Sequence, residues 1–264
     1  MSEAVRVPVA NRTRFLVRRE HPLLRVLALV ALLVLWELVA RAGWVPVLFL
    51  PSPLGVLAEG WSMLVSGELA GHLAASLKRL VLGFVIGGGL GVAVGIAVGF
   101  FSVADAVGTP IIAATFPVPK IALLPLLILW LGLGEPSKVA VIALGVFFPM
   151  AVATFAAIDD VPRNLVRMAQ SFGVPFADVV RKVLLPGALP GILSGFRISA
   201  SIALLLVVAA EMIGADRGIG AFVMQAGNLM QTDQLLAGVA VLSILGLVIG
   251  IGLSRLERAL LSWR

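Results

Sequence analysis

Six apolar runs constrain the fold of this chain more than any other feature of its sequence. They lie at residues 23–40, 80–101, 107–131, 139–157, 192–213 and 235–253. A helix needs about 20 apolar residues to cross a bilayer, and each run has close to that length. Segments of this kind satisfy their backbone hydrogen bonds in lipid as helices. The sequence therefore predicts an all-α polytopic membrane protein with six transmembrane helices.

The composition excludes most other classes of protein. Hydrophobic residues make up 60% of the 264 residues and charged residues 13%, whereas a soluble domain has about 45–50% and about 25%. A water-soluble globule and a disordered chain are both excluded. The chain has no cysteine and only two histidines, His21 and His72, so no disulfide, thiol nucleophile or His-based metal cluster is expected. No metal, cofactor or nucleic acid is expected to bind.

The runs divide the chain into a short tail and one membrane domain. Residues 1–22 form a polar cytoplasmic tail, and residues 23–264 form the membrane domain. The first run is interpreted as a retained anchor, because it is too long for a signal peptide and lacks a convincing cleavage site. Residues 42–79 are an external connection with a short interfacial helix near 54–65. Residues 158–190 are the long cytoplasmic loop.

The distribution of Lys and Arg orients the predicted spans. Positive residues concentrate in cytoplasmic segments, and six spans place both termini on one side. That side holds 14 of the 20 Lys and Arg residues, Lys120 lies inside a run, and the opposite side holds the other five: Arg41, Lys78, Arg79, Lys138 and Arg217. Both termini are therefore predicted to be cytoplasmic, in the inner or plasma membrane of the cell. The Lys78–Arg79 pair, at the outer mouth of the second span, departs from the rule.

The second run carries glycine at every fourth position. The five residues share one helix face: Gly83, Gly87, Gly91, Gly95 and Gly99. Such a stripe of small residues lets another helix approach closely in lipid. A phosphate-binding loop is excluded, because no Gly-Lys-Ser/Thr sequence follows. The stripe therefore predicts helix packing, and the chain has no recognisable device of its own for binding ATP.

The cytoplasmic loop has the pattern of two short amphipathic helices. Pro162 can begin the first helix and Gly173 can end it, and a second helix is expected from Pro175 to about Leu184, stopping near Pro186. The apolar face of the first helix comprises Leu165, Val166, Ala169 and Phe172. Its polar face comprises Arg163, Arg167 and Gln170. Such a helix pair docks onto a partner or rests on lipid headgroups, and the pattern leaves both alternatives open.

The same loop resembles the EAA loop of permease subunits of ATP-binding-cassette importers. That motif reads Glu-Ala-Ala, three residues, Gly, nine residues, Ile, one residue, Leu-Pro. Five positions agree with it in identity or type: Ala169, Gly173, Val183, Leu185 and Pro186. Arg167 and Met168 replace the Glu and the first Ala, so any salt bridge made by that Glu is not expected here.

Other segments resemble the nitrate, sulfonate and taurine branch of these permeases. Residues 119–135 are similar to the signature of its third span, and residues 143–149, 209–220 and 255–264 are also typical of it. The similarity runs from about Leu54 to the end of the chain. Pyrimidine-precursor permeases share much of the pattern, so the resemblance does not name one substrate.

The resemblance implies the type I importer permease fold. It implies a permease subunit that moves a small anion, such as an aliphatic sulfonate, taurine or nitrate, into the cytoplasm. The implied partners are a second copy of the chain, two separate ATPase subunits and an extracytoplasmic substrate-binding protein, with no catalytic site in this chain. The loop would be the coupling helix that contacts the ATPase. Its coupling residues would be Arg163, Leu165, Arg167, Ala169, Phe172, Gly173, Leu185 and Pro186.

Ionisable residues within the spans are costly to bury in lipid and mark candidate sites. Lys120 follows two prolines that interrupt the third span; a cation there suits an anionic substrate, although the side chain can also snorkel to the cytoplasmic headgroups. Glu211, near the outer end of the fifth span, either faces the permeation path or caps the external loop. Glu37 is expected to reach the interface or Arg41. The substrate-path candidates are Lys120, Glu211 and Trp130, the last from the third span.

Three alternatives are weighed against a sulfonate-type importer. The same machine could carry a vitamin pyrimidine precursor or another small metabolite. A stand-alone secondary transporter or channel would show inverted repeats and several mid-membrane charges, but the sequence has no convincing internal repeat and few such charges. An intramembrane enzyme would need a Ser/His, paired Asp or metal constellation, and none is apparent in the spans.

Overall fold

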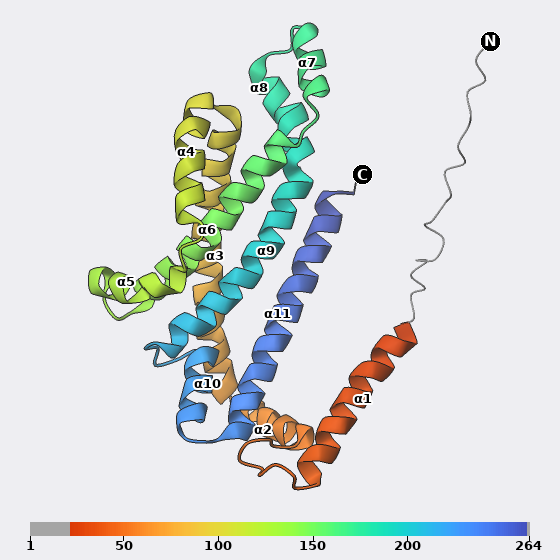
Figure 1. The fold of residues 1–264 in the computed structure, drawn as a ribbon, viewed down its shortest axis with the longest axis vertical. Coiled ribbons are helices and arrows are strands. Elements are labelled where there is room, and N and C mark those ends of the chain that lie inside the picture. Colours follow the sequence, from red (N-terminus) through yellow and green to blue (C-terminus); the bar gives the residue numbers. More distant parts are fainter. Residues whose placement is uncertain (1–21, 263–264) are drawn as a thin grey trace, which may run out of the picture. The chain divides into compact units, whose positions relative to one another are not determined.

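The structure, a computed structural model, describes residues 22–262 (Figure 1). All regular elements in this part of the chain are helices, as predicted. They fall into two compact units, one ending at Leu54 and one beginning at Gly55, and each is described by itself. The predicted N-terminal tail, apart from Pro22, lies outside the described residues.

The first unit contains helix α1 (Pro22–Arg41), which coincides with the first predicted span. Glu37 Oε1 accepts a hydrogen bond from Arg41 Nε at 2.5 Å, and Glu37 Oε2 accepts another from the backbone N–H of Leu54 at 3.3 Å. The expected pairing of Glu37 with Arg41 is present, and it also fastens the loop that follows the helix. With 20 residues, α1 has the length that a bilayer requires, and its crossing of the membrane stays a prediction.

The second unit is a helical bundle with several short elements (Figure 1). In chain order, with α2 starting at its border, they are α2 (Pro53–Val65), α3 (Glu68–Phe100), α4 (Ser102–Thr115), η2 (Lys120–Leu123), α5 (Leu124–Leu131), α6 (Glu135–Asp159), α7 (Arg163–Ser171), α8 (Phe176–Val179), η3 (Val180–Leu184), α9 (Leu185–Met212), α10 (Ile219–Asn228) and α11 (Thr232–Leu260). The element η2 is a 3-10 turn, and η3 is a π-helical turn. The short helix predicted near residues 54–65 corresponds to α2.

Four helices of this unit are long and apolar enough to cross a membrane: α3, α6, α11 and the continuous helix Phe176–Met212 that includes α9. A fifth candidate is formed by α4 together with Lys120–Leu131, and this pair is bent by 88°. These segments correspond in position to predicted spans two to six. The second span differs in that its helix begins at Glu68 rather than at residue 80, because Leu69 is buried in a hydrophobic cluster with α10.

Two other features differ from the prediction. Helix α10 occupies the external loop between the last two spans, where no helix is predicted. The second loop helix does not stop near Pro186, because the chain passes through η3 into α9 as one helix. The backbone N–H of Leu185 donates to the carbonyl of Val180, five residues back. This π-type bond places Pro186 in the first turn of α9, where a missing N–H is tolerated.

The main hydrophobic core lies between α3, α6 and α9. Its fully buried side chains include Leu124, Val141, Ile142, Met150 and Val207. The glycine stripe of α3 faces α6: a Cβ added at Gly87 would lie 2.2 Å from the carbonyl oxygen of Ala143. At Gly83, Gly91 and Gly95, the nearest atoms of α6 would lie at 2.5–2.6 Å, and at Gly99 they would lie at 3.0 Å. The two helices therefore approach more closely than any side chain would allow.

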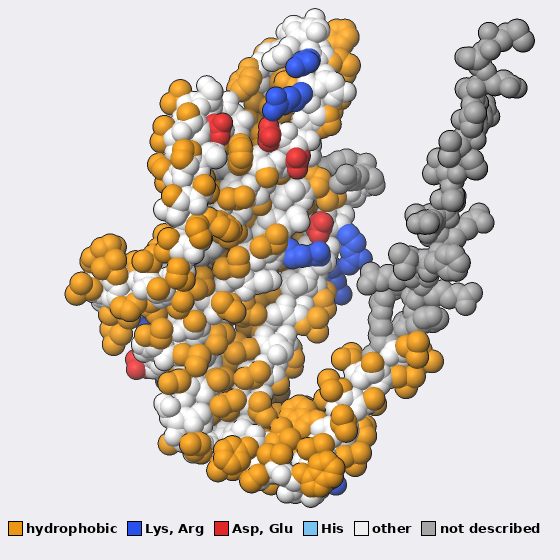
Figure 2. All heavy atoms as spheres, in the orientation of Figure 1, with side chains coloured by type: hydrophobic (Ala, Val, Ile, Leu, Met, Phe, Trp, Pro, Cys, Tyr) orange, Lys and Arg blue, Asp and Glu red, His pale blue; other side chains and the backbone are white. Residues whose placement is uncertain are grey.

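A second, smaller core lies at the end of the unit where α2, α10 and the starts of α3 and α11 meet. Its buried members are Val56, Met63, Leu69, Ile219, Phe222, Ala226 and Ala237. The opposite end carries α7 and α8 (Figure 1). Between the two ends, hydrophobic side chains spread over the visible face of the spans, while Lys and Arg side chains form two groups, one near α7 and one near the C-terminal end of α11 (Figure 2). This distribution is what a membrane-embedded bundle requires.

The close approach of α3 and α6 predicts the effect of adding a single methyl group. Gly91→Ala should lower the stability of the detergent-purified protein by about 1–3 kcal/mol, because overpacking a close-packed interior is destabilising. The new Cβ would lie 2.6 Å from Met150 Cβ and from the carbonyl oxygen of Phe147. The measurement is the midpoint of thermal unfolding.

Gly89→Ala is the matched control, because a Cβ at Gly89 meets no atom within 4 Å. This variant should be neutral or gain up to about 1 kcal/mol from helix propensity. Equal shifts in the two variants would show that the glycine stripe is not a packing surface.

Candidate functional site

The tip of the unit is built by α7 and the turn that follows it. Pro162 precedes the helix and Gly173 follows it with φ of +71°, the conformation in which glycine ends a helix without strain. The backbone N–H of Gly173 donates to Gln170 O at 2.9 Å, and that of Val174 donates to Ala169 O at 3.1 Å. These two bonds satisfy the last carbonyls of α7 and turn the chain sharply toward α8.

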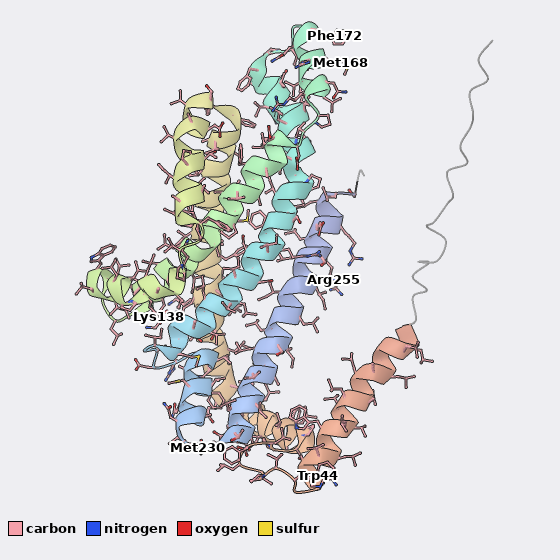
Figure 3. All side chains as sticks on the ribbon, viewed as in Figure 1. Trp44, Lys138, Met168, Phe172, Met230 and Arg255 are labelled. Atoms are coloured by element: carbon pink, nitrogen blue, oxygen red, sulfur yellow. The ribbon has the colours of Figure 1, made fainter. Side chains whose placement is uncertain are left out.

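The tip exposes a stripe of three apolar side chains. Leu165 is 41% exposed, Met168 55% and Phe172 80%, and Figure 3 shows Met168 and Phe172 at the very end of the unit. Val166 and Ala169, which the sequence places on the same face, are half-buried. Met168 was not predicted to belong to this face, although its spacing of three from Leu165 and four from Phe172 is the signal that could have found it.

Charged groups border this stripe and line a small cavity behind it. Arg163 Nη2 lies 3.2 Å from Asp159 Oδ1. The cavity has a volume of about 290 Å³ and is lined by residues that include Asp159, Arg163, Arg167 and Gln170. Arg163 and Arg167 are both exposed, so the tip combines an apolar stripe with positive charge.

Leu185 and Pro186 lie one helix further on, at the start of α9, where Leu185 is half-buried and Pro186 is exposed. They are separated from the stripe by α8 and η3. The structure therefore brings Arg163, Leu165, Arg167 and Phe172 together on the tip. The Leu-Pro pair belongs to the segment that joins the tip to the long span.

The third predicted span is broken between α4 and α5, as its two prolines require. Pro119 has no N–H to donate to the carbonyl of Thr115, four residues back. Lys120 supplies the missing donor: its Nζ donates to Thr115 O at 2.6 Å, to Val118 O at 2.8 Å and to Phe116 O at 3.1 Å. The ammonium group also lies 4.4 Å from the ring centroid of Phe148 on α6. The side chain of Lys120 thus closes the end of α4.

Beyond the break, α5 carries an exposed tryptophan. Trp130 is 68% exposed, and its neighbour Leu129 is 79% exposed. The other face of this short helix is buried through Leu124 and Leu127. Trp130 and Lys120 therefore belong to the same broken span, but the Lys120 ammonium group is engaged by backbone carbonyls.

Glu211 lies in a buried charge cluster at the opposite end of the unit. Its side chain is fully buried, as is almost all of Arg79, and Glu211 Oε1 accepts a hydrogen bond from Arg79 Nη1 at 2.7 Å. Glu211 Oε2 accepts bonds at 2.9 Å from Ser76 Oγ and from the backbone N–H of Gly220. Because Gly220 is in the first turn of α10, Glu211 caps that helix, which favours the second of its two predicted roles.

Arg79 also binds Glu135, at the start of α6. Arg79 Nε donates to Glu135 Oε2 at 2.9 Å and Arg79 Nη2 donates to Glu135 Oε1 at 2.5 Å, a bidentate geometry that suits the planar guanidinium. Lys138 is also buried, and its Nζ donates to Gly134 O at 3.2 Å; Figure 3 places it near the start of α6. The departure of Arg79 from the charge rule is thus explained, since it is paired inside the protein. A glutamate within a span requires a partner, and this is the signal by which Arg79 could have been found.

An apolar helical bundle with the short helices α7 and α8 at one end agrees with comparisons with known proteins. The family model described as "Binding-protein-dependent transport system inner membrane component" matches residues 87–262. The chain belongs to this family. It is therefore a multi-pass membrane permease, a transport subunit of a binding-protein-dependent ATP-binding-cassette importer.

Several curated proteins are similar over much of the chain. The aliphatic sulfonates transport permease protein SsuC of Escherichia coli (strain K12) is 37% identical over 89% of this chain and 89% of its own length. The taurine transport system permease protein TauC of the same strain is 44% identical over 58% of this chain and 56% of its own length. The riboflavin transport system permease protein RibX of Chloroflexus aurantiacus is 36% identical over 97% of this chain and 96% of its own length.

A solved structure has the same fold. The inward-facing MetNI methionine ABC transporter contains a chain that superposes with a TM-score of 0.62, covering 73% of this chain and 95% of that chain at 24% identity. The predicted type I importer permease fold is confirmed by this likeness.

The carbonyl bonds of Lys120 predict that its removal weakens the break between α4 and α5. Lys120→Met should destabilise the purified protein by about 1–2 kcal/mol, because it removes charge-assisted hydrogen bonds to three carbonyls, of which the one to Thr115 is partly buried. The midpoint of thermal unfolding measures this effect. In the control Lys182→Met, which removes an exposed pair with Asp178, the change should stay below about 1 kcal/mol. A loss of transport with unchanged stability would instead assign Lys120 to anion passage.

Proposed function

We propose that this chain is the permease subunit of an importer for small sulfonate-type anions. The observation that carries the proposal is the similarity to the sulfonate permease SsuC, which extends over 89% of both chains. Similarity to the taurine permease TauC supports the same class of substrate. Aliphatic sulfonates and nitrate are compact anions, and taurine is a compact zwitterion that carries the same sulfonate group. The chain moves them inward, and ATP is hydrolysed by separate subunits.

The tip of α7 is the surface that contacts the ATPase in this proposal. An exposed apolar stripe flanked by exposed arginines suits docking into a groove of another protein, because apolar side chains supply contact area and the charged rim supplies orientation. Arg163, Leu165, Arg167 and Phe172 are the contact residues, joined by Met168. Ala169 and Gly173 shape the end of the helix, while Leu185 and Pro186 connect it to α9.

Movement of this tip reaches the spans through both of its flanking segments. The chain enters α7 directly from α6, through a turn at Asp160–Pro162, and leaves it through α8 and η3 into α9. When ATP draws two ATPase subunits together, the docked tips move with them and reorient the spans. Coupling of this kind requires one element whose position both sites sense, and the tip is that element.

Two copies of the chain enclose the permeation path in this proposal. Irregular backbone at membrane depth is tolerated only where protein or a water-filled cavity surrounds it. The segment 116–119 between α4 and η2 is exposed in the single subunit. A second copy, with the path between the two, would meet this requirement and would place Trp130 at the path. The tip and both termini then lie in the cytoplasm, and α10 faces the binding protein outside.

A second candidate substrate class is a vitamin-like metabolite. The riboflavin permease RibX is similar over 97% of this chain, which is a greater share than the sulfonate permease covers. The identities, 36% and 37%, do not separate the two classes. Competition for uptake distinguishes them.

The substrate experiment uses the complete importer in proteoliposomes, with its cognate ATPase and binding protein. Uptake of radiolabelled taurine should depend on ATP and on the binding protein, and an excess of unlabelled ethanesulfonate should suppress it while riboflavin should not. Uptake of radiolabelled riboflavin, unaffected by ethanesulfonate, would overturn the sulfonate proposal and favour the second class. The same complex without ATP gives the background.

The geometry of Gly173 predicts how coupling fails. Gly173→Val should leave insertion and assembly intact but abolish stimulation of ATP hydrolysis by the loaded binding protein, because a β-branched residue at this positive φ costs about 1–3 kcal/mol and misdirects the tip. Gly173→Asn is the matched control, since Asn adopts the left-handed conformation more readily. It should retain most of the stimulation. Full stimulation in the Val variant would show that the tip does not couple the two subunits.

A further inference from the structure

The charge cluster around Arg79 lies at the boundary between the two hydrophobic cores of the second unit. Arg79 is followed by Leu80, and Glu211 is preceded by Ala210, both of which belong to the main core. Ile219, at the start of α10, belongs to the smaller core. The cluster therefore lies where two apolar cores meet: the one between the spans α3, α6 and α9, and the one formed by α2, α10 and the starts of α3 and α11.

Four side chains bind the segment 217–220 that leads into α10: His72, Ser76 and Arg79 of α3 and Glu211 of α9. Arg79 Nη1 donates to Arg217 O at 2.6 Å in addition to Glu211, so one guanidinium binds α6, α9 and the loop before α10. Ser76 Oγ accepts a hydrogen bond from the backbone N–H of Ile219 at 2.9 Å and donates one to Glu211 Oε2 at 2.9 Å. His72 Nδ1 lies 2.9 Å from the carbonyl oxygen of Gly218. The start of α10 is thus bound by three successive turns of α3.

The contacts at Glu211 leave no room for α10 to slide along the end of α9. A Cβ at Gly218 would lie 2.3 Å from the carboxyl carbon of Glu211, and one at Gly220 would lie 2.5 Å from the carbonyl oxygen of Val208. Only glycine at both positions lets α10 approach the end of α9 so closely. If α10 moved away, Arg79 would lose the carbonyl of Arg217, and Glu211 would lose the backbone N–H of Gly220. The two side chains would stay paired with each other, but they are only 4% and 0% exposed, and each would be left with an unmet hydrogen-bonding group, which is unfavourable.

We propose that Arg79 is a positioning residue that keeps the start of α10 fixed to α3, α6 and α9 throughout the transport cycle. The outer end of each subunit then moves as one body, and α10 does not swing as a separate gate. This inference rests on the proposed importer function, because it assigns a part to Arg79 within that cycle.

A covalent tether across the joint tests the proposal directly. The chain has no cysteine, and Ser76 Oγ lies 2.9 Å from the backbone nitrogen of Ile219, so Ser76→Cys with Ile219→Cys places a pair across the boundary. In the complete importer, oxidation of this pair should leave taurine uptake within about twofold of the reduced form, the spread expected of uncoupled changes. Loss of uptake on oxidation, with recovery on reduction, would overturn the proposal, because the joint would then have to open. Loss of free thiol on oxidation shows that the disulfide has formed before uptake is measured.

A neutral pair of substitutions separates positioning from folding. Arg79→Met with Glu211→Gln removes both buried charges and keeps an acceptor for Ser76 and Gly220, so the complex should assemble better than with Arg79→Met alone. Uptake per ATP hydrolysed should nevertheless fall by roughly fivefold or more, the lower end of measured couplings. Uptake per ATP equal to that of the unmodified importer would assign Arg79 a purely structural role and overturn the proposal.

Rescue by the tether completes the test. When the cysteine pair is added to the neutral pair, oxidation should restore uptake per ATP, because the disulfide holds α10 where the hydrogen bonds from Arg79 to Arg217 O and from the Gly220 N–H to Glu211 held it. Lack of rescue, with the disulfide formed, would also overturn the proposal. These outcomes differ from failure of the proposed function, in which the unmodified importer itself shows no ATP-dependent uptake of taurine.

Discussion

The close contact between α3 and α6 is the interaction on which the rest of the second unit depends. In lipid, helices gain little from burying apolar surface against each other, so contact has to come from backbones that approach closely. Four glycines of α3 lie where a Cβ would meet α6 within 2.6 Å. With α3 fixed in this way, α9 completes the core, and the outer end of α3 is in place to present Ser76 and Arg79 to the start of α10.

The sequence predicted the features that arise from local patterns. Apolar runs indicated the spans, the spacing of four indicated one packing face of α3, and Gly173 after an amphipathic pattern indicated the end of α7. In each case the physical cause lies within one continuous segment of chain. The prolines before Lys120 likewise indicated a break, although the bonds that Lys120 makes to three carbonyls depend on how sharply the chain turns there.

Features that join distant segments could not be read in the same way. Arg79 and Glu211 are separated by 132 residues, and the sequence treats one as an exception to a charge rule and the other as an isolated acid. Helix α10 is capped by the side chain of Glu211 from another helix, so its first residue could not be predicted from its own sequence. The sequence also did not predict that the helix continues past Pro186. It continues through a π-helical turn, in which a backbone N–H bonds to the carbonyl five residues back, and no sequence periodicity marks such a turn.

The uninterrupted helix from Phe176 to Met212 gives the chain a lever arm. Its 37 residues extend over roughly 55 Å at about 1.5 Å per residue, whereas the apolar interior of a bilayer is about 30 Å thick. The predicted span covers residues 192–213, so in the proposed importer the difference lies at the α7 end, where η3 joins it to the span in one continuous helix. A tilt of about 10° would sweep a tip that projects about 25 Å through roughly 4 Å. In the proposed importer, a small tilt of the membrane-embedded part of this helix would therefore accompany a larger displacement of the tip that contacts the ATPase.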